Sequence, residues 1–346
     1  MSYLFNILKD PNRKSLLKMT KEILQEGYKW KCIPYHYFTR FAFRKDVNPN
    51  SFIPNQVFDN FLSYKNLDQY KYLINDKVVF FYILDKFKKP QPKTIGSCFN
   101  GLFTIIDPKN RNKEQSISEK GFLQFFEYIF THSNVKDLFI KRVDGSWGKD
   151  AFILNHLSYK ENQMLCKQLE NGYWIIQERI VQHPILSQIN SSSLNTIRID
   201  TILDDENKPE VISALLRFGI KDSIVDNVSA GGFFVGIEED GRLKKTAYSF
   251  LKTGGQQIMK HLDSNVVFEN IQLPYWNDVI NLVLNLAIQF PQIKAIGWDI
   301  ALTEKGPIVV EANNDYHIGM SEIASGGYLK NEKFAKHFKD FRKKIK

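Results

Sequence analysis

The chain has 346 residues, more than one compact core usually holds, so we expect two or three subdomains. Its net charge is +9, and its apolar content of 43% is that of a globular protein rather than a disordered one. The longest apolar run, residues 78–84, is far shorter than the roughly 20 residues of a transmembrane helix. Secretory signals have a basic region followed by an apolar core, and the N-terminus shows no such pattern. We therefore expect a cytoplasmic protein.

The three cysteines, Cys32, Cys98 and Cys166, are scattered and form no CxxC pair. An odd number of separated cysteines is typical of reduced thiols, and it excludes a disulfide framework or a zinc site built on cysteine pairs.

The first 70 residues are rich in helix formers and aromatic side chains, with Pro34, Pro49 and Pro54 interrupting the runs. This pattern predicts a helical N-terminal region. Asn75, Asp76 and Lys77 then precede the apolar run at residues 78–84, a pattern that predicts the start of a capped helix.

A strand is expected near residues 94–98. The capping-box spacing of Ser116 and Glu119 predicts a helix that runs to about His132.

Residues 138–141 and 151–154 read as two strands that enclose a glycine-rich loop. A loop of this kind between antiparallel strands is a flap, unlike the strand-to-helix turn of a P-loop. Gly145 and Gly148 would let backbone N–H groups approach phosphates, and Lys141 would add a positive charge from the strand. An ordinary hairpin turn is at least as compatible with this motif alone.

Downstream, strands are expected over residues 173–180, 193–201, 211–218 and 231–237, and a helix over 276–290. The second of these strands alternates cleanly and puts Arg198 on its polar face. Arg217 lies in the third strand. Asp226 and Asn227 fall in the loop that follows it.

Residues 297–313 predict a hairpin. Glu304, Lys305 and Gly306 form its turn, where the glycine can take the left-handed conformation that a three-residue loop requires. If Thr303 pairs with Pro307, the apolar side chains share one face. These are Ile296, Trp298, Ile300 and Leu302.

The opposite face of this hairpin collects oxygen ligands. In the same register Asp299 lies opposite Glu311, and Gly297 lies opposite Asn313. Two facing carboxylates repel each other, and a divalent cation removes that conflict. Carboxylate and amide oxygens suit Mg²⁺. The residues therefore predict a magnesium site, and the alternative is an edge hairpin whose polar face meets water.

The tail, residues 330–346, reads as a basic amphipathic helix. Its cations either form a solvated face or attract an anionic substrate, a membrane surface or a polyanion. Since no nucleic-acid-binding module accompanies the charge, no nucleic acid is expected as a partner.

Taken in order, these features resemble the ATP-grasp superfamily: a lysine before an early helix, a lysine strand with a flap, a Gln-Glu-Arg-Ile strand, a central arginine, and Asp followed by Glu-x-Asn. The phrases at residues 193–198, 225–232 and 296–301 resemble its sugar-transfer-associated branch. The resemblance covers roughly residues 70–325.

The resemblance implies an α+β ATP-grasp fold in which two α+β subdomains clasp ATP, preceded by a helical N-terminal region. The expected segments are 1–70 (helical), 71–135 (linker α/β), 136–182 (small subdomain with the flap) and 183–346 (C-terminal subdomain with the metal site).

The same resemblance implies roles for individual residues, with ATP and Mg²⁺ as cofactors. Arg198 and Lys141 are the expected catalytic residues. The expected ATP contacts are Lys77, Lys141, Gly145, Ser146, Gly148, Gln177, Glu178 and Ile180. The expected metal ligands are Asp299, Glu311 and Asn313. Arg217, Asp226, Asn227 and His317 are expected to bind substrate.

The activity implied is an ATP-dependent carboxylate–amine ligase that works through an acyl-phosphate. Its substrates would be an amino acid and a uronic acid or related sugar of a cell-surface polysaccharide, a context that leaves room for peripheral association with membrane-linked assembly. The alternatives are an inactive nucleotide-binding scaffold and a sugar kinase. His183 and His317 are candidates for a base, with a structural role as the alternative for each.

Overall fold

The computed structural model describes residues 2–106, 116–117, 121–145, 150–220, 228 and 231–344. The chain forms two compact units. The larger comprises residues 1–71, 182–307 and 312–346, and the smaller comprises residues 72–181 and 308–311. The predicted boundaries at 70/71 and 182/183 each lie one residue from these divisions. Whether the four predicted segments fold as separate domains stays a prediction.

The smaller unit is built on a six-stranded sheet with the order β3-β2-β1-β6-β4-β5. Its strands are β1 (Thr94–Phe99), β2 (Leu102–Ile105), β3 (Ser116–Ile117), β4 (Asp137–Arg142), β5 (Ala151–Asn155) and β6 (Tyr173–Glu178). Its helices are α5 (Tyr72–Asn75), α6 (Lys77–Lys86), α7 (Phe122–His132), η3 (Tyr159–Glu161) and α8 (Gln163–Leu169).

The two sides of β6 face different helices. Ile176, which is fully buried, shares a core with Phe125 and Phe126 of α7 and with Leu165 and Leu169 of α8. The next residue back, Ile175, packs with Val78 and Phe81 of α6. The side-chain alternation of a strand therefore positions α6 on the side of the sheet that also carries Lys141, the partner of Ile175 in the β4–β6 register.

The larger unit holds a seven-stranded sheet with the order β11-β10-β9-β8-β7-β12-β13. Its strands are β7 (Ile197–Leu203), β8 (Pro209–Phe218), β9 (Phe233–Ile237), β10 (Leu243–Tyr248), β11 (Gln257–Ile258), β12 (Ala295–Thr303) and β13 (Gly306–Asn313). Residues 308–311 of β13 group with the smaller unit.

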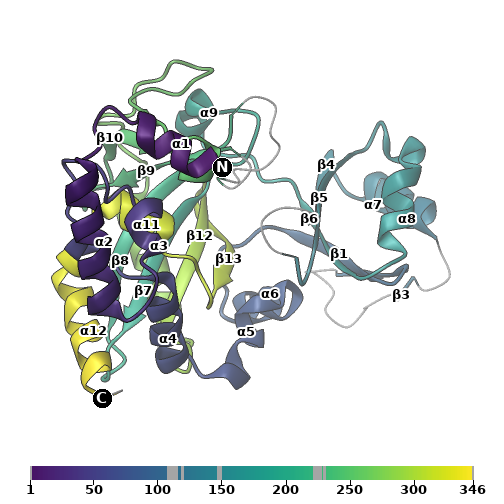
Figure 1. Cartoon of the computed structure of the whole chain (residues 1–346). Coiled ribbons are helices and arrows are strands. Elements are labelled where there is room, and N and C mark those ends of the chain that lie inside the picture. The colour runs from purple at the N-terminus through teal and green to yellow at the C-terminus, as the bar shows by residue number, and fades with distance from the viewer. Residues whose placement is uncertain are drawn as a thin grey trace. The chain divides into compact units, whose positions relative to one another are not determined.

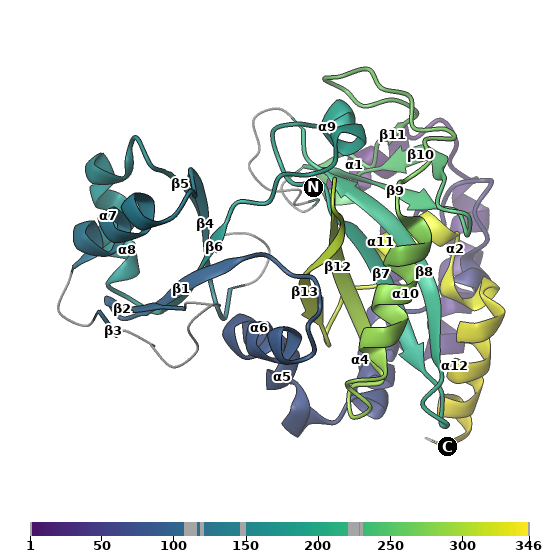
Figure 2. The ribbon, with the colours of Figure 1, turned by 180° about the vertical axis from the view of Figure 1, so that it is seen from behind.

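The helices of the larger unit come from both ends of the chain. They are α1 (Ser2–Lys9), α2 (Leu16–Trp30), α3 (Tyr35–Thr39), η1 (Pro49–Ser51), α4 (Asn55–Lys65), η2 (Asp68–Tyr70), α9 (Pro184–Ile189), η5 (Leu251–Thr253), α10 (Trp276–Ala287), α11 (Gly319–Ser325), η6 (Tyr328–Lys330) and α12 (Glu332–Lys344). Helices α4, α11 and α12 cover one face of the sheet (Figure 1), and α10 covers the other (Figure 2).

The N-terminal region is part of the core of the larger unit. Phe58 and Phe61 of α4 pack with Phe334 and Phe338 of α12, and Tyr37 shares a second core with Leu215 and Phe234 of the sheet. Within the described residues, no helix combines the length and hydropathy needed to cross a membrane.

Most predicted elements are confirmed, including the helical N-terminal region, the Asp76-capped helix and the 297–313 hairpin. The predicted helix start at Ser116 is wrong. Ser116 and Ile117 form β3 and pair with Thr104 and Phe103 of β2, and the helix begins at Phe122. Edge pairing to a sheet therefore takes precedence over the local capping pattern there.

Candidate functional site

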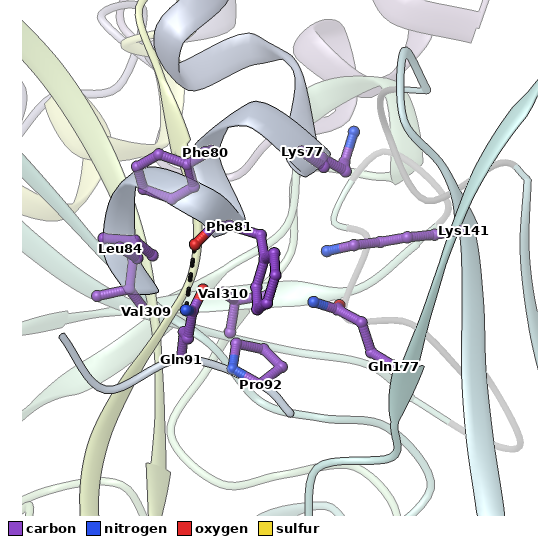
Figure 3. A pocket seen from close by; sticks show the side chains of 10 residues that line it. All are labelled: Lys77, Phe80, Phe81, Leu84, Gln91, Pro92, Lys141, Gln177, Val309 and Val310. Atoms are coloured by element: carbon purple, nitrogen blue, oxygen red, sulfur yellow. Dashed lines mark hydrogen bonds between the residues drawn. The ribbon is translucent and has the colours of Figure 1, made fainter. Parts of the chain in front are cut away.

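A pocket in the smaller unit collects three of the predicted ATP contacts, Lys77, Lys141 and Gln177. Lys141 and Gln177 point toward Phe81 (Figure 3). The remaining lining residues are Phe80, Phe81, Leu84, Gln91, Pro92, Val309 and Val310. The lining thus combines aromatic and aliphatic side chains with two lysine ammonium groups and side-chain amides.

Lys77 is the first residue of α6. Asp76 caps this helix by accepting hydrogen bonds from the backbone N–H groups of Val78 and Val79, each at 2.9 Å. The Nζ of Lys77 donates to the carbonyl oxygens of Val143 (3.0 Å) and Gly145 (2.6 Å). Burial lowers the pKa of Lys77. The negative charge of Glu311 is the largest of the effects that raise it, but burial outweighs them. The lysine thus holds the base of the flap by two backbone contacts.

Lys141 lies on β4 and is only 9% exposed. On β6, Gln177 is buried, and its side-chain amide donates to Thr94 Oγ1 at 3.1 Å. Glu178 forms an ion pair with Lys93 at 3.1 Å, and its backbone N–H donates to the Lys93 carbonyl. Ile180 follows the strand and is partly exposed. The two lysines and Gln177 are therefore brought together, whereas Glu178 and Ile180 do not line the pocket.

The predicted flap is described only at its edges. Gly145 follows β4, and a Cβ there would approach the Cβ of Arg142 to 2.8 Å, so a larger residue would force the turn to open. Ser146 and Gly148 lie outside the described residues, as do Asp226 and Asn227.

A second polar cluster lies in the larger unit, where Arg198 of β7 stands opposite Asp299 of β12 in the antiparallel register. Arg198 binds the carboxylate with Nε at 2.6 Å and Nη2 at 3.1 Å. Arg217 adds a contact at 3.0 Å and also donates to Thr196 Oγ1. Asp299 is 1% exposed, so water does not solvate this part of the hairpin.

Two guanidinium groups thus contact one carboxylate. A buried charge needs partners of opposite sign. The two arginines therefore hold the buried Asp299 carboxylate in place by charge-assisted hydrogen bonds.

Glu311 and Asn313 are two residues apart on β13, so strand alternation turns their side chains to one face. Asn313 Nδ2 contacts the carbonyl oxygen of Gly297 at 3.4 Å, which places Asn313 beside Gly297. A Cβ at Gly297 would come within 2.9 Å of the Tyr316 ring, so only glycine fits this point of β12.

The donor set of Asp299, Glu311 and Asn313 fits Mg²⁺ chemically, because all three offer hard oxygen ligands. Asp299 already accepts bonds from two arginines, so a cation would share its carboxylate with them. Across the described part of the chain, no group of three or more His, Cys, Asp or Glu side chains could hold a metal. The magnesium set, with only two carboxylates, stays a prediction.

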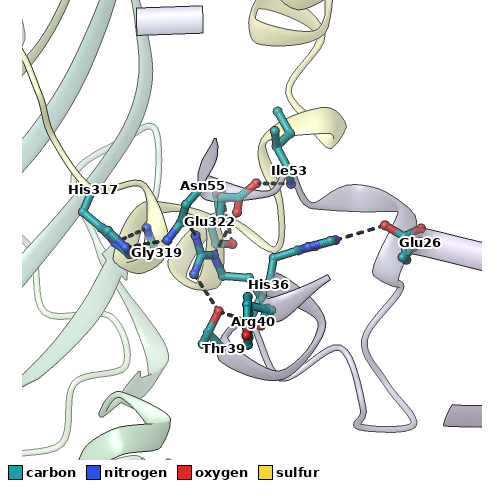
Figure 4. Close-up of polar contacts among 11 residues, drawn as sticks. Glu26, His36, Thr39, Arg40, Ile53, Asn55, His317, Gly319 and Glu322 are labelled. Atoms are coloured by element: carbon teal, nitrogen blue, oxygen red, sulfur yellow. Dashed lines mark hydrogen bonds and ion pairs between the residues drawn. The ribbon is translucent and has the colours of Figure 1, made fainter. Parts of the chain in front are cut away.

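His317 ends a chain of polar contacts in the larger unit (Figure 4). Arg40 forms a buried ion pair with Glu322 at 2.9 Å and donates to the Asn55 side-chain oxygen. The Asn55 amide nitrogen lies 2.8 Å from His317 Nε2, and the Gly319 N–H donates to His317 Nδ1 at 3.2 Å. Both ring nitrogens therefore face N–H donors.

Protonation of His317 is accordingly unfavourable. Although the residue is exposed, desolvation of the ring, and then the charge of Arg40, lower its pKa. Proton uptake would also turn both nitrogens into donors that face donors. His317 is thus poorly suited to accept a proton, and both of its ring nitrogens are engaged by groups of the chain itself. His183 caps α9 through the Ile185 N–H at 3.3 Å, which is a structural role.

The apolar side chains that line the pocket were not predicted from the sequence. The run at residues 78–84 predicts a helix but not which of its faces lines a cavity, and Val309 and Val310 carry no chemical signal. Nor was the role of Asp200, which is fully buried and accepts hydrogen bonds from Ser213, Ser321 and Tyr328. Partners this distant in sequence leave no local motif.

Comparison with solved structures gives remote similarities. An ATP-grasp ligase, PsnB, complexed with a minimal precursor, Mg and ADP shares 15% identity, with 80% of this chain and 62% of that chain covered and a TM-score of 0.43. D-alanyl-alanine synthetase A from Vibrio cholerae O1 biovar eltor str. N16961 shares 8% identity. The match covers 78% of this chain and 65% of that chain, with a TM-score of 0.45. D-alanine–D-alanine ligase from Bacillus anthracis shares 14% identity. The match covers 79% of this chain and 70% of that chain, with a TM-score of 0.41.

This chain thus spans 62% and 65% of the first two of these structures. Among curated proteins, none matches it. The family described as sugar-transfer associated ATP-grasp matches residues 57–339, which include every predicted site residue. Because the match covers most of the sequence, the chain belongs to the sugar-transfer-associated ATP-grasp family.

Proposed function

We propose that the protein is an ADP-forming ligase that joins a carboxylate to an amine through an acyl-phosphate. The observation that carries the proposal is the placement of Lys77, Lys141 and Gln177 around one pocket in a chain of this family. The description of the family as sugar-transfer associated supports a sugar substrate. We infer an amide between an amino acid and a uronic acid of a cell-surface polysaccharide, made in the cytoplasm.

In the first step a carboxylate oxygen attacks the γ-phosphorus of ATP, and ADP leaves. Charge builds on the phosphoryl oxygens, so catalysis needs positioning and neutralisation rather than a side-chain nucleophile. Lys77 and Lys141 would hold the phosphates, and Arg198 would meet the transferred group. Asp299, Glu311 and Asn313 would hold Mg²⁺, which supplies further neutralisation of the triphosphate when bound.

In the second step the amine nitrogen attacks the acyl carbon, phosphate leaves, and the nitrogen loses a proton. Arg198 would stabilise the oxyanion, and Arg217 would bind an acidic substrate group. Because protonation of His317 is disfavoured, this residue would not take the proton. The amine would be recruited in its neutral form or would release its proton to water.

The test follows ADP release with uronates and amino acids, each alone and in pairs. A ligase releases ADP when both are present and forms an amide that mass spectrometry detects. A sugar kinase ignores the amine, and a nucleotide-binding scaffold releases no ADP. Either of the last two outcomes, across both panels, contradicts the proposal.

A further inference from the structure

Among the described residues of the larger unit, the outward side of α2 is unusually apolar and exposed. Leu17 is 83% exposed, Leu24 68% and Tyr28 90%. With Lys21 these side chains recur at helical spacing and fall within an arc of about 60° at about 100° per residue. Large apolar side chains that share an exposed stripe mark an interaction surface, unlike single exposed residues.

The charges of α2 are sorted by sign. Both carboxylates turn inward: Glu22 accepts from Lys14 and Tyr37, and Glu26 accepts from Trp30 and His36. The exposed residues of the helix include Lys18, Lys21 and Lys29 and no acidic residue. The outward face of α2 is therefore apolar and cationic together.

Helix α12 extends this basic surface. It lies next to the C-terminal end of α2, where Phe338 packs edge-on against Trp30 and Arg342 stacks over the same ring. Its buried side holds Phe334, Phe338 and Phe341, and its outward side carries exposed lysines. These are Lys333, Lys336, Lys339, Lys343 and Lys344, with one exposed carboxylate, Glu332, among them. Lys343 forms an ion pair with Asp340, and Lys344 forms one with Asp205.

We propose that the outward face of α2, with the lysines of α12 beside it, docks on an anionic phospholipid surface. Leucine and tyrosine side chains flanked by lysines are the pattern of helices that lie in the membrane interface, where the apolar side chains enter the headgroup boundary and the lysines meet the lipid phosphates. The inward carboxylates of α2 suit this partner, since an outward carboxylate on that helix would be repelled, and on α12 five exposed lysines outnumber Glu332. The docking does not depend on the proposed ligase activity.

The test is co-sedimentation of the full chain with vesicles of phosphatidylcholine alone or mixed with phosphatidylglycerol. We expect binding to the mixed vesicles and at least about tenfold weaker binding to phosphatidylcholine, because each lysine near an anionic surface contributes about fivefold. The triple variant Leu17→Ser, Leu24→Ser, Tyr28→Ser should lose binding, and Lys18→Gln with Lys21→Gln should weaken it about tenfold or more.

The matched controls change exposed residues elsewhere on the larger unit. Met259→Ser with Leu262→Ser, and Lys252→Gln with Lys260→Gln, remove side chains of the same kinds and should bind vesicles as the wild type does. Equal binding to both vesicle types, or wild-type binding by the triple variant, overturns the proposal. So does self-association of the wild type that the triple variant loses, because the face would then belong to a second copy.

Discussion

The pocket of the smaller unit and the Asp299 cluster of the larger unit both bury charge, but they stabilise it differently. In the pocket, Lys77 is held by two backbone carbonyl oxygens, and burial lowers its pKa. In the cluster, Arg198 and Arg217 are held by one shared carboxylate. The lysine thus contacts neutral oxygens, with the charge of Glu311 acting to raise its pKa, whereas the arginines bind a carboxylate directly.

The family resemblance assigns both groups of residues to the site, but this difference predicts that their substitution affects folding differently. Lys77 is partly exposed and contacts neutral backbone oxygens, so replacing it should cost little in the free energy of unfolding. In the cluster, Asp299 is buried and binds two arginines, so removing it takes a charged partner from both and should destabilise the fold. The same substitution should therefore affect activity and stability in different proportion in the two regions.

Asp299→Ala should have the largest effect. It takes the carboxylate away from buried Arg198 and partly buried Arg217, which costs about 3–5 kcal/mol in the free energy of unfolding. ADP release should also be lost. Denaturant unfolding checks the stability, with Asp278→Ala on the exposed side of α10 as the control. A variant as stable as the wild type would show that the cluster is not a structural unit.

Glu311→Gln should lower ADP release at least about a hundredfold, the scale on which single charge-stabilising groups act. Unfolding should change little, because Glu311 is partly exposed. Glu304→Gln, at the exposed turn of the same hairpin, is the matched control and should release ADP normally. If the two variants behave alike, Glu311 is not a metal ligand.

Lys77→Met should lower ADP release about tenfold to a hundredfold and change how stability depends on pH. In the wild type the folded-state pKa of Lys77 lies below its ordinary value of 10.5, so the unfolded chain holds more protons between those two values. Stability therefore rises with pH in that alkaline window. Methionine should remove this rise in unfolding measurements across the window. An unchanged slope would place Lys77 outside the buried environment.

His317→Gln should have the smallest effect, confined to mildly acidic pH. Its pKa falls from an ordinary 6.5 to about 4, so the unfolded chain takes up a proton that the folded protein refuses. Stability is then lost as pH falls through that window, and glutamine should reduce the loss. Thermal unfolding at several pH values measures this, with exposed His132→Gln as the control. Equal slopes for both variants would contradict the assignment.

The sequence is most informative where chemistry and local geometry coincide. The hairpin over residues 297–313 follows from alternation and from Gly306, whose φ of 110° is in the range that glycine favours. The cap at Asp76 follows from side-chain chemistry. The contact of Arg198 with Asp299 could not be predicted, because it depends on β7 pairing with β12, about a hundred residues further along the chain.

The same limit explains the missing partners of His317. Arg40 and Asn55 precede residue 57, where the family match begins, and only the packing of the N-terminal helices brings them to His317. Long-range packing of this kind is set by the shape of the apolar core rather than by any motif. A family resemblance that begins near residue 70 gives no signal for it.

The most direct measurement is calorimetric titration of a non-hydrolysable ATP analogue with magnesium into the wild type, Lys141→Ala and Lys136→Ala. Lys141 lines the pocket, and Lys136 is exposed one residue before the same strand. We predict binding to the wild type and to Lys136→Ala, and affinity lowered at least about tenfold in Lys141→Ala. Failure of the wild type to bind, or equal affinity in all three proteins, would contradict the account.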